Sequence, residues 1–506
     1  MNFPTKSRPI GVVLLVTLFA IALPNTVHGV DQSKDFVDWP IVQSSGDRTP
    51  ALLPRADQSS IQFQVGTGFD GRVIGSDAGK SQGYQCTSPF DQRCVDQRIS
   101  TLTTQRWKSL NQLPICLSPR DNTPCIERIL ISESNGEKYA LSPSGTIPGY
   151  QWPANKAYGS PAGALTNKWK SSKDSEGSGF ILSAQINIQG SYKQNRTDVI
   201  DFKTNFLRYE LTPLTDPYLI ANQWTFCLWV EKLNGEDKCA RQKFLDTNSL
   251  ITITYHLPKE VTGWFAGRMS DASLTIESID SDFNSVTVSA YPVEVPVFAA
   301  TIPCVKGWVP CGAGVILGFT PSPLQDYIQS LQVILKDQAT FEIPTWGLRS
   351  TNKRAFEGCE VPEKGFAGLI FSNASFVNSF PPIFEDEMLR YEMGALHLKS
   401  DGSVFKGNFD MFIESGFARC LWKLSKAPVQ ASISVTSKDG NQNIATTSLG
   451  ERNGFIRMKA AGFTFSTSTV EMKLQNKQTT ISCVKGKTVK KVTAVQPTCP
   501  TGFKKK

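Results

Sequence analysis

The sequence has little of what metal-dependent or nucleophilic catalysis requires. Its 506 residues include only three histidines, no Cys-x-x-Cys pair, and no P-loop or His-Glu-x-x-His motif. A serine triad would have to use His256 or His397, and neither lies in a recognisable context. The usual zinc sites of mixed cysteine and histidine lack ligands for the same reason. We therefore predict no metal site and no cofactor, and the sequence favours a non-enzymatic protein.

Long apolar runs are also scarce, and the one that occurs is N-terminal. Lys6 and Arg8 precede an apolar stretch over residues 10–23, and residues 27–29 place short side chains at cleavage positions. This pattern predicts a secretory signal peptide over residues 1–29. An uncleaved anchor is the alternative, although the run is short for a bilayer. We expect the mature chain to be secreted or associated with the cell surface, without a transmembrane segment.

Acidic residues are absent from the C-terminal tail. Residues 472–506 hold nine lysines and no aspartate or glutamate, and residues 1–29 add two basic residues. The formal net charge of +8 therefore leaves residues 30–471 at −3. This asymmetry favours a tail that binds polyanions over a protein that is basic throughout. The lysines expected to bind are Lys485, Lys487, Lys490, Lys491, Lys504, Lys505 and Lys506.

The residues that the sequence does have in number are cysteine, glycine and proline. Twelve cysteines, 38 glycines and 30 prolines accompany short segments rich in Val, Ile, Thr and Phe. Such segments between turn residues are typical of an all-β protein. In an exported chain the cysteines predict disulfides rather than metal ligands, and their spacing favours near neighbours. The predicted pairs are Cys86–Cys94, Cys116–Cys125, Cys227–Cys239, Cys304–Cys311, Cys359–Cys420 and Cys483–Cys499.

Two short loops between paired cysteines share a Ser-Pro-x-Asp sequence. They occupy residues 86–94 and 116–125, and a strand-like segment follows each. Proline presets φ and aspartate can bond the backbone, so each loop is predicted to be a tight turn closed by a disulfide. We expect these turns to have a structural role.

A larger self-similarity suggests a duplication. The strings Leu-Arg-Tyr-Glu, Cys-Leu-Trp and Gly-aromatic recur in the same order, first over residues 207–264 and then over residues 389–455. We interpret the landmarks as strands of two related β-sandwich-like domains in tandem, with residues 207–210 superposing on 389–392 and Trp229 on Trp422.

One short helix is predicted between the copies, near residues 322–337, where Ser322-Pro323 precedes apolar residues at helical spacing. The predicted division is a signal peptide at 1–29, a cysteine-stapled β region at 30–165, the first copy at 166–300, a connecting segment at 301–362, the second copy at 363–475 and the basic tail at 476–506.

Two weaker patterns favour structural roles. Residues 66–71 match Gly-x-Gly-x-x-Gly, but more glycine follows and no helix is expected to begin, so a dinucleotide site is not predicted. Asp280, Asp282 and Asn284 have the spacing that opens a calcium loop, but Ser285 stands where that loop needs glycine. We predict a polar turn there.

The last 26 residues carry the strongest resemblance to a known family, and the stapled loop at Cys125-Ile126-Glu127 and residues 418–474 are also similar to proteins that have such a tail. Residues 483–506 contain CVKGK, then KKVT, then CP-x-G-F-KKK. This tail resembles that of uncharacterised exported actinobacterial proteins, although Thr501 and Phe503 differ from the residues that are commoner there. The resemblance implies secretion and surface association and no known activity. From its residues, the tail is predicted to be a disulfide-closed hairpin, which either docks to anionic polymers or only solubilises the chain and protects a strand edge.

These features lead to two hypotheses of different classes. The first is a non-enzymatic secreted or cell-surface protein that binds anionic cell-wall polymers or glycans, with no nucleic-acid partner; the oligomeric state is not predicted. The alternative is a secreted carbohydrate-active hydrolase that uses a pair of carboxylates. Such pairs have no spacing signature, and the acids considered are Glu210, Glu392, Asp410 and Glu414.

Overall fold

The structure is a computed structural model, and it describes most of the chain from residue 104 onward. The described residues are 60–65, 68–69, 75–76, 83–84, 104–147, 152–153, 162–174, 178–193, 199–214, 218–219, 229–233, 236–240, 243–259, 261, 263–297, 299–302, 312–315, 338–339, 341–350, 355–356, 358–360, 366–377, 381–426, 428–437, 442–443, 446–465 and 468–506. The predicted signal peptide and the helix near 322–337 lie outside these residues.

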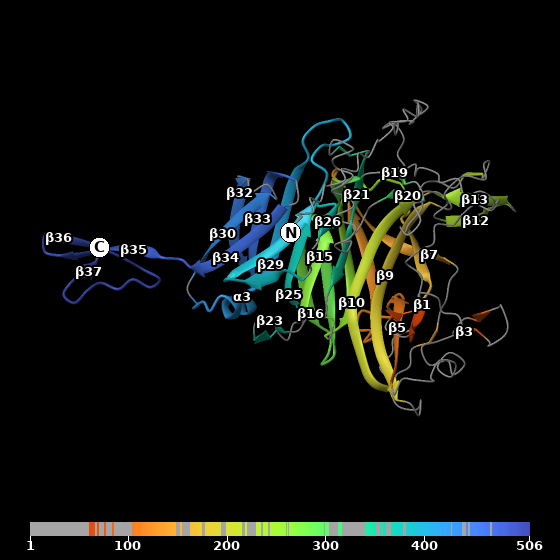
Figure 1. The fold of residues 1–506 in the computed structure, drawn as a ribbon, viewed down its shortest axis with the longest axis horizontal. Coiled ribbons are helices and arrows are strands. Elements are labelled where there is room, and N and C mark those ends of the chain that lie inside the picture. Colours follow the sequence, from red (N-terminus) through yellow and green to blue (C-terminus); the bar gives the residue numbers. More distant parts are fainter. Residues whose placement is uncertain are drawn as a thin grey trace, which may run out of the picture. The chain divides into compact units, whose positions relative to one another are not determined.

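Strands dominate the described residues, which confirms the all-β prediction. Seventeen strands form one connected system with two parts, sheet A and sheet B (Figure 1). Sheet A contains β1 (Ser60–Val65), β2 (Gly68–Phe69), β5 (Thr104–Gln112), β8 (Thr166–Lys170), β9 (Gly179–Lys193), β10 (Val199–Leu214), β15 (Gly263–Arg268), β22 (Gly347–Ser350), β25 (Phe366–Ser372), β29 (Lys406–Glu414), β32 (Thr446–Arg452) and β33 (Phe455–Thr464). Sheet B contains β6 (Cys125–Ser132), β7 (Lys138–Ile147), β14 (Leu250–Pro258), β16 (Ser270–Ser278) and β17 (Phe283–Tyr291).

A third sheet and several small ones complete the described strands. Sheet C contains β26 (Phe376–Val377), β27 (Ile383–Glu385), β28 (Met388–Gly394), β30 (Val429–Ser437), β31 (Gln442–Asn443) and β34 (Ser468–Asn476). The basic sheet contains β35 (Thr479–Lys485), β36 (Thr488–Ala494) and β37 (Lys504–Lys505). The remaining strands are β3 (Gly75–Ser76) with β4 (Gly83–Tyr84), β11 (Tyr218–Leu219) and β12 (Trp229–Leu233) with β13 (Glu236–Ala240), β18 (Val293–Val297) with β21 (Phe341–Thr345), β19 (Ala299–Ile302) with β20 (Gly312–Val315), and β23 (Ala355–Phe356) with β24 (Cys359–Glu360).

Two hydrophobic cores lie on opposite faces of sheet A. Phe265 of β15 and Leu369 of β25 belong to the first core, with residues of sheet B. Their neighbours Trp264 and Ile370 belong to the second core, with residues of sheet C. Because successive side chains of a strand point to opposite faces, β15 and β25 are buried on both sides. Their near-continuous apolar sequences follow from this position.

The landmarks of the predicted duplication occupy different positions in the fold. Residues 207–210 lie in β10, which pairs with β9 and β22 of sheet A. Residues 389–392 lie in β28, which pairs with β26, β27 and β34 of sheet C. In addition, β15 and β25 pair directly in parallel, although one closes the first predicted copy and the other opens the second. The two segments therefore do not superpose as predicted, because their strands pair in different sheets.

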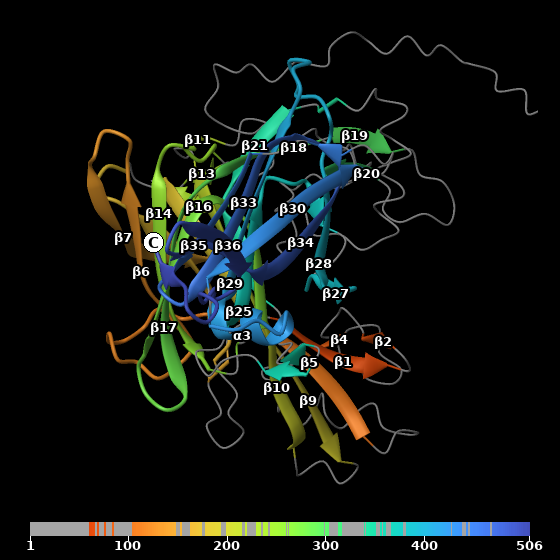
Figure 2. The same ribbon diagram turned by 90° about the vertical axis from the view of Figure 1, so that its left-hand side faces the viewer.

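The one helix within the described residues stands where the sequence predicts a strand. Cys420 lies in α3 (Ser415–Leu421), and Trp422 is its C-cap (Figure 2). The Glu414 side chain caps the N-terminus by accepting a hydrogen bond from the Phe417 amide. Helical spacing places Phe417, Ala418 and Leu421 in the second core, which explains why a helix forms here. The strand interpretation of Cys420–Trp422 was wrong.

Gly368 provides a test of the packing between the two cores. A Cβ at this position of β25 would collide with the Trp264 ring and lie 2.6 Å from the Phe412 carbonyl oxygen. We expect Gly368→Ala to lower the free energy of unfolding by about 2 kcal/mol, as overpacking in a core does. Gly450→Ala is the matched control, because a Cβ on that exposed strand residue would meet nothing within 4 Å. Denaturant unfolding measures both, and equal stabilities would contradict the expectation.

Candidate functional site

The loop between Cys116 and Cys125 is a tight turn closed by a disulfide, as predicted. The two Cα atoms are 5.0 Å apart, and the Asp121 amide donates to the Ser118 carbonyl at 3.1 Å. The Asp121 carboxylate accepts hydrogen bonds from the Leu117 amide at 2.8 Å and from the Thr123 amide at 3.1 Å. Burial alone would raise the pKa of Asp121, but these hydrogen bonds outweigh it and lower the pKa. The turn is therefore organised by its aspartate.

His256 ties this loop to sheet B. Its ring is fully buried on β14, with Nδ1 2.6 Å from the Asp121 carbonyl oxygen and Nε2 3.0 Å from Glu127 Oε2. A carbonyl can only accept, so Nδ1 carries a proton and donates it. The second hydrogen bond also needs one proton between its two atoms. His256 and Glu127 together therefore carry no net charge.

The same histidine lies beside the disulfide, which the sequence did not suggest. The Cys116 and Cys125 sulfurs and a ring nitrogen of His256 all lie within 4.8 Å of one another. The sulfurs are bonded to each other, so they offer no thiolate to a metal. In this oxidised state the three residues form a structural cluster.

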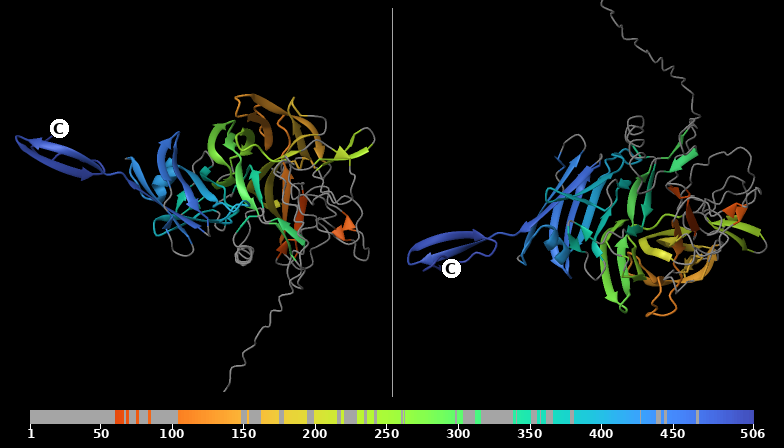
Figure 3. Two further views of the ribbon diagram at one scale, coloured as in Figure 1. Left: turned by 90° about the horizontal axis from the view of Figure 1, so that it is seen from above. Right: turned by 60° about the horizontal axis from the view of Figure 1, so that its bottom comes forward.

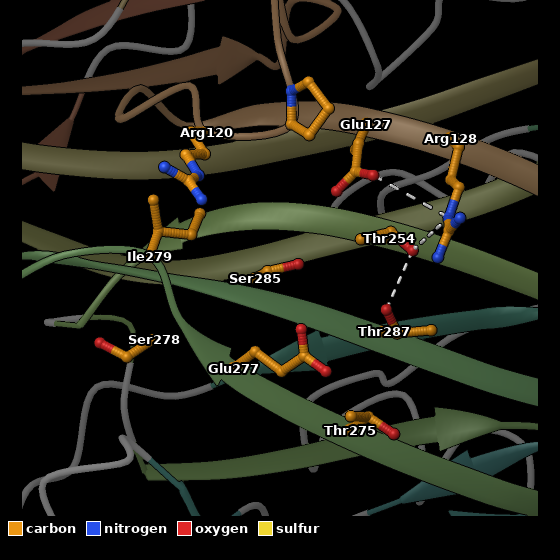
Figure 4. A pocket seen from close by; sticks show the side chains of 11 residues that line it. Arg120, Glu127, Arg128, Thr254, Thr275, Glu277, Ser278, Ile279, Ser285 and Thr287 are labelled. Carbon is orange, nitrogen blue, oxygen red and sulfur yellow. Dashed lines mark hydrogen bonds and ion pairs between the residues drawn. The ribbon is translucent and has the colours of Figure 1, made fainter.

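A cavity of about 540 Å³ opens on the face of sheet B opposite the first core (Figure 4). We call it the outer pocket. It is lined by Pro119, Arg120, Glu127, Arg128, Thr254, Thr275, Glu277, Ser278, Ile279, Ser285 and Thr287. The lining contains charged and hydroxyl side chains and no aromatic ring. The pocket is therefore suited to a polar ligand.

Strand register explains how these side chains come together. Thr254 of β14 is paired with Arg128 of β6 on one side and with Thr287 of β17 on the other, and Thr287 is paired with Thr275 of β16. Paired residues of antiparallel strands share a face, so one row of polar groups crosses the sheet. A register shift after Thr254 leaves Glu127 as the extra residue of β6. Such bulges re-aim side chains, and here the bulge adds the Glu127 carboxylate to the pocket.

Hydrogen bonds fix part of the row, and the two arginines beside the pocket are exposed. The hydroxyls of Thr254 and Thr287 are 2.9 Å apart, and Arg128 Nε donates to Thr254 Oγ1 at 3.3 Å. The Arg128 side chain is 55% exposed, and its Nε lies 4.0 Å from Glu127 Oε1. Arg120 is exposed at the tip of the disulfide loop, and its guanidinium has no partner among the described residues.

The basic sheet is the second candidate site. The Cys483–Cys499 disulfide links β35 to the segment before β37, and Cys483 is paired with Lys490 of β36 and with Lys505 of β37. Figure 3 shows these strands in blue at the C-terminal end of the ribbon. The seven lysines predicted to bind polyanions are all exposed. None of the ion pairs between described residues involves them, whereas Lys473 is held at 2.7 Å by Glu387. Lys490 Nζ lies 5.2 Å from the centre of the Phe503 ring.

Three of the six predicted disulfides are present, and the other three lie outside the described residues. Cys359–Cys420 and Cys483–Cys499 are present, as is Cys116–Cys125. The remaining predictions concern side chains outside the described residues: Cys86–Cys94, Cys227–Cys239 and Cys304–Cys311.

The acids considered for hydrolysis do not meet in the outer pocket. Asp410 is buried and bonded to Arg457, Glu414 caps α3, and Glu392 lies in β28 of sheet C. The Glu210 side chain is outside the described residues. The carboxylates that do line the pocket, Glu127 and Glu277, were not singled out by the sequence, because alternating polar residues on strands also describe any solvated sheet face.

The described residues of the two weaker motifs belong to a strand and a turn. Gly68–Phe69 of the glycine-rich segment form β2, which pairs with β1. The Asp280 carboxylate accepts hydrogen bonds from the amides of Asp282 and Phe283 at 2.7 and 2.8 Å. That segment is the polar turn between β16 and β17, as predicted.

Comparisons with known proteins found no relative of this chain. No family model, curated protein or solved structure matches the chain. Within the residues that the structure describes, no helix is long and apolar enough to cross a membrane. The outer pocket and the basic sheet are therefore the features from which a function can be inferred.

Proposed function

We propose that the protein is a binding protein of the extracytoplasmic space, secreted or held at the cell surface, which docks to anionic polymers through its basic sheet. One observation carries the proposal: seven lysines of a small folded sheet are exposed and have no acidic partner among the described residues. The three disulfides support it, because such bonds persist in oxidising compartments.

The arrangement of the lysines suits a repeating polyanion. Lys490 and Lys505 flank Cys483 in register and so share one face of the sheet. Lys491, paired with Ser482, is on the opposite face, and Lys487 lies in the turn between β35 and β36. Fields of exposed charges are screened over about 8–10 Å at physiological salt. A polymer that contacts the basic sheet therefore meets chiefly the local charge of residues 472–506, which contain nine lysines and no acid.

The geometry favours binding over the alternative of carbohydrate hydrolysis. A glycosidase needs an acid and a second carboxylate that both face the scissile bond. The outer pocket has two carboxylates, Glu127 and Glu277. Glu127 is hydrogen-bonded to the buried His256, so only Glu277 is without a bond to that histidine. We therefore do not propose a hydrolase.

The proposal is tested with full-length protein on immobilised dextran sulfate. We expect the combined change of all seven of these lysines to glutamine, the tail-neutral variant, to weaken binding at least about tenfold near physiological salt; the residues are Lys485, Lys487, Lys490, Lys491, Lys504, Lys505 and Lys506. The matched control changes the same seven residues to arginine, which preserves the charge, and it should bind like the wild type. Wild-type protein should elute with added salt and should not bind neutral dextran.

Two results would overturn polyanion docking. One is a tail-neutral variant that binds dextran sulfate as tightly as the wild type does. The other is wild-type binding that does not respond to salt. In either case the basic sheet only solubilises the chain or protects a strand edge. Removal of residues 483–506 should agree in direction with the tail-neutral variant, because it removes seven lysines and one disulfide.

A further inference from the structure

We infer that the outer pocket binds an acidic sugar of the hexuronate type, in which a ring of hydroxyls carries one carboxylate. The inference goes beyond polyanion docking and does not rest on it, because the pocket shares no residue with the basic sheet. Its volume of about 540 Å³ is that of an ordinary small-molecule site.

The charges that line the pocket leave a positive excess. Arg120 and Arg128 supply two guanidinium groups, and Glu277 supplies one carboxylate. Glu127 adds no further net charge, because it shares a proton with His256. Guanidinium groups bind carboxylates through parallel hydrogen bonds, so the excess favours a ligand with a single carboxylate.

The hydroxyl groups of the pocket favour a ligand that carries hydroxyl groups as well as a negative charge. Ser285 and Thr287 of β17 lie between the arginines and Glu277 of β16, and Thr275 lies on the same strand as Glu277 (Figure 4). Each hydroxyl can donate one hydrogen bond and accept others, and the Glu277 carboxylate can accept from a ligand hydroxyl. A ligand with several hydroxyls can satisfy these groups, whereas an inorganic anion would meet the repulsion of Glu277 without that compensation.

The pocket is held in shape before any ligand arrives. Pro119 and Arg120 belong to the loop that the Cys116–Cys125 disulfide closes. His256 fastens the same loop to sheet B through the Asp121 carbonyl. Fixed walls reduce the conformational entropy lost on binding, so even a small polar ligand can be held.

Glucuronate is the test ligand, and it is measured by calorimetry in the tail-neutral variant so that the lysines of the basic sheet do not contribute. We expect glucuronate to bind at least about tenfold more tightly than glucose, which lacks the carboxylate, and than acetate or phosphate, which lack the ring hydroxyls. A glucuronate disaccharide is measured in the same way to identify the source of the ligand. Tighter binding of the disaccharide than of glucuronate indicates that the ligand is part of a polymer, and not a free monosaccharide.

Variants assign the binding to the pocket. Arg128→Gln and Arg120→Gln should each weaken glucuronate binding about fivefold to tenfold, and Thr287→Val should weaken it by less. Arg128 and Thr287 lie on the outer face of sheet B and Arg120 lies in the exposed disulfide loop, so the fold should persist, and thermal melting checks it. Arg452→Gln is the matched control, because Arg452 is an exposed arginine of β32 outside the pocket.

The inference is overturned by any of three results. Glucuronate does not bind; or acetate and phosphate bind as tightly as glucuronate, which would make the pocket a simple anion site; or both arginine variants bind glucuronate like the wild type. Loss of dextran sulfate binding in the tail-neutral variant with glucuronate binding retained would separate the two sites. The failure of one proposal can therefore be told apart from the failure of the other.

Discussion

Arg457→Gln is expected to lower the free energy of unfolding by about 3 kcal/mol at neutral pH. Arg457 of β33 donates from Nε to Asp410 Oδ1 at 2.9 Å and from a terminal nitrogen to the other carboxylate oxygen. The Asp410 side chain is only 6% exposed, so the variant leaves a buried carboxylate without its bidentate partner. The Arg457 side chain itself is 38% exposed, so the expected loss of stability is at the lower end of the range for breaking a buried ion pair.

The same substitution should make stability depend more strongly on pH. Burial raises the pKa of Asp410 above its ordinary value of 3.8, and the hydrogen bonds from Arg457 oppose that rise. A carboxyl whose pKa is higher in the folded state contributes stability below its unfolded pKa and loses it as pH rises through the folded pKa. Removing Arg457 raises the folded pKa further. The deficit of the variant should therefore be larger at pH 7 than at pH 4.

Urea unfolding at the two pH values measures both effects. Lys459→Gln is the matched control, because Lys459 lies on the same strand and pairs with Asp271, which is 57% exposed. Exposed pairs contribute about 1 kcal/mol or less. A deficit for Arg457→Gln that is the same at both pH values would mean that Arg457 stabilises the fold by packing on the Phe412 ring, 4.9 Å away, and not by its charge.

The parts of the fold that the sequence predicted depend on local signals. The disulfide-closed turn at 116–125 follows from proline and aspartate within one loop, and the basic hairpin follows from Cys483, Cys499 and the turn between them. Each of these features is set by residues close together in the chain.

The parts that could not be predicted depend on which distant strands meet. The parallel pairing of β15 with β25 joins residues about one hundred positions apart, and no local pattern specifies it. The same short string, Cys-Leu-Trp, lies at the end of a helix in one place because Phe417 and Leu421 can fill the second core there. Tertiary packing therefore decided the secondary structure of that string.

The outer pocket was missed for a related reason. Its residues come from the disulfide loop and from strands β6, β14, β16 and β17, so they are assembled only when sheet B forms. The alternation at Thr252, Thr254 and His256 was a usable signal, since it places a histidine on the outward face of a strand. The burial of that histidine under the 116–125 loop was not visible from its position in the sequence.

Replacing both Cys359 and Cys420 by alanine is expected to lower the free energy of unfolding by about 4 kcal/mol, because the bond closes a loop with a sequence separation of 61 residues. The bond joins β24 to α3, so breaking it releases both from the edge of the second core. The matched control is the alanine pair at Cys483 and Cys499, which lies within the basic sheet and should leave the unfolding midpoint of the two cores unchanged. Guanidinium unfolding followed by tryptophan fluorescence reports on those cores, since Trp264, Trp346 and Trp422 are buried there. A loss below about 1 kcal/mol for the first pair would mean that β24 and α3 stay associated in the unfolded chain without the bond, since the disulfide acts chiefly by restricting that state.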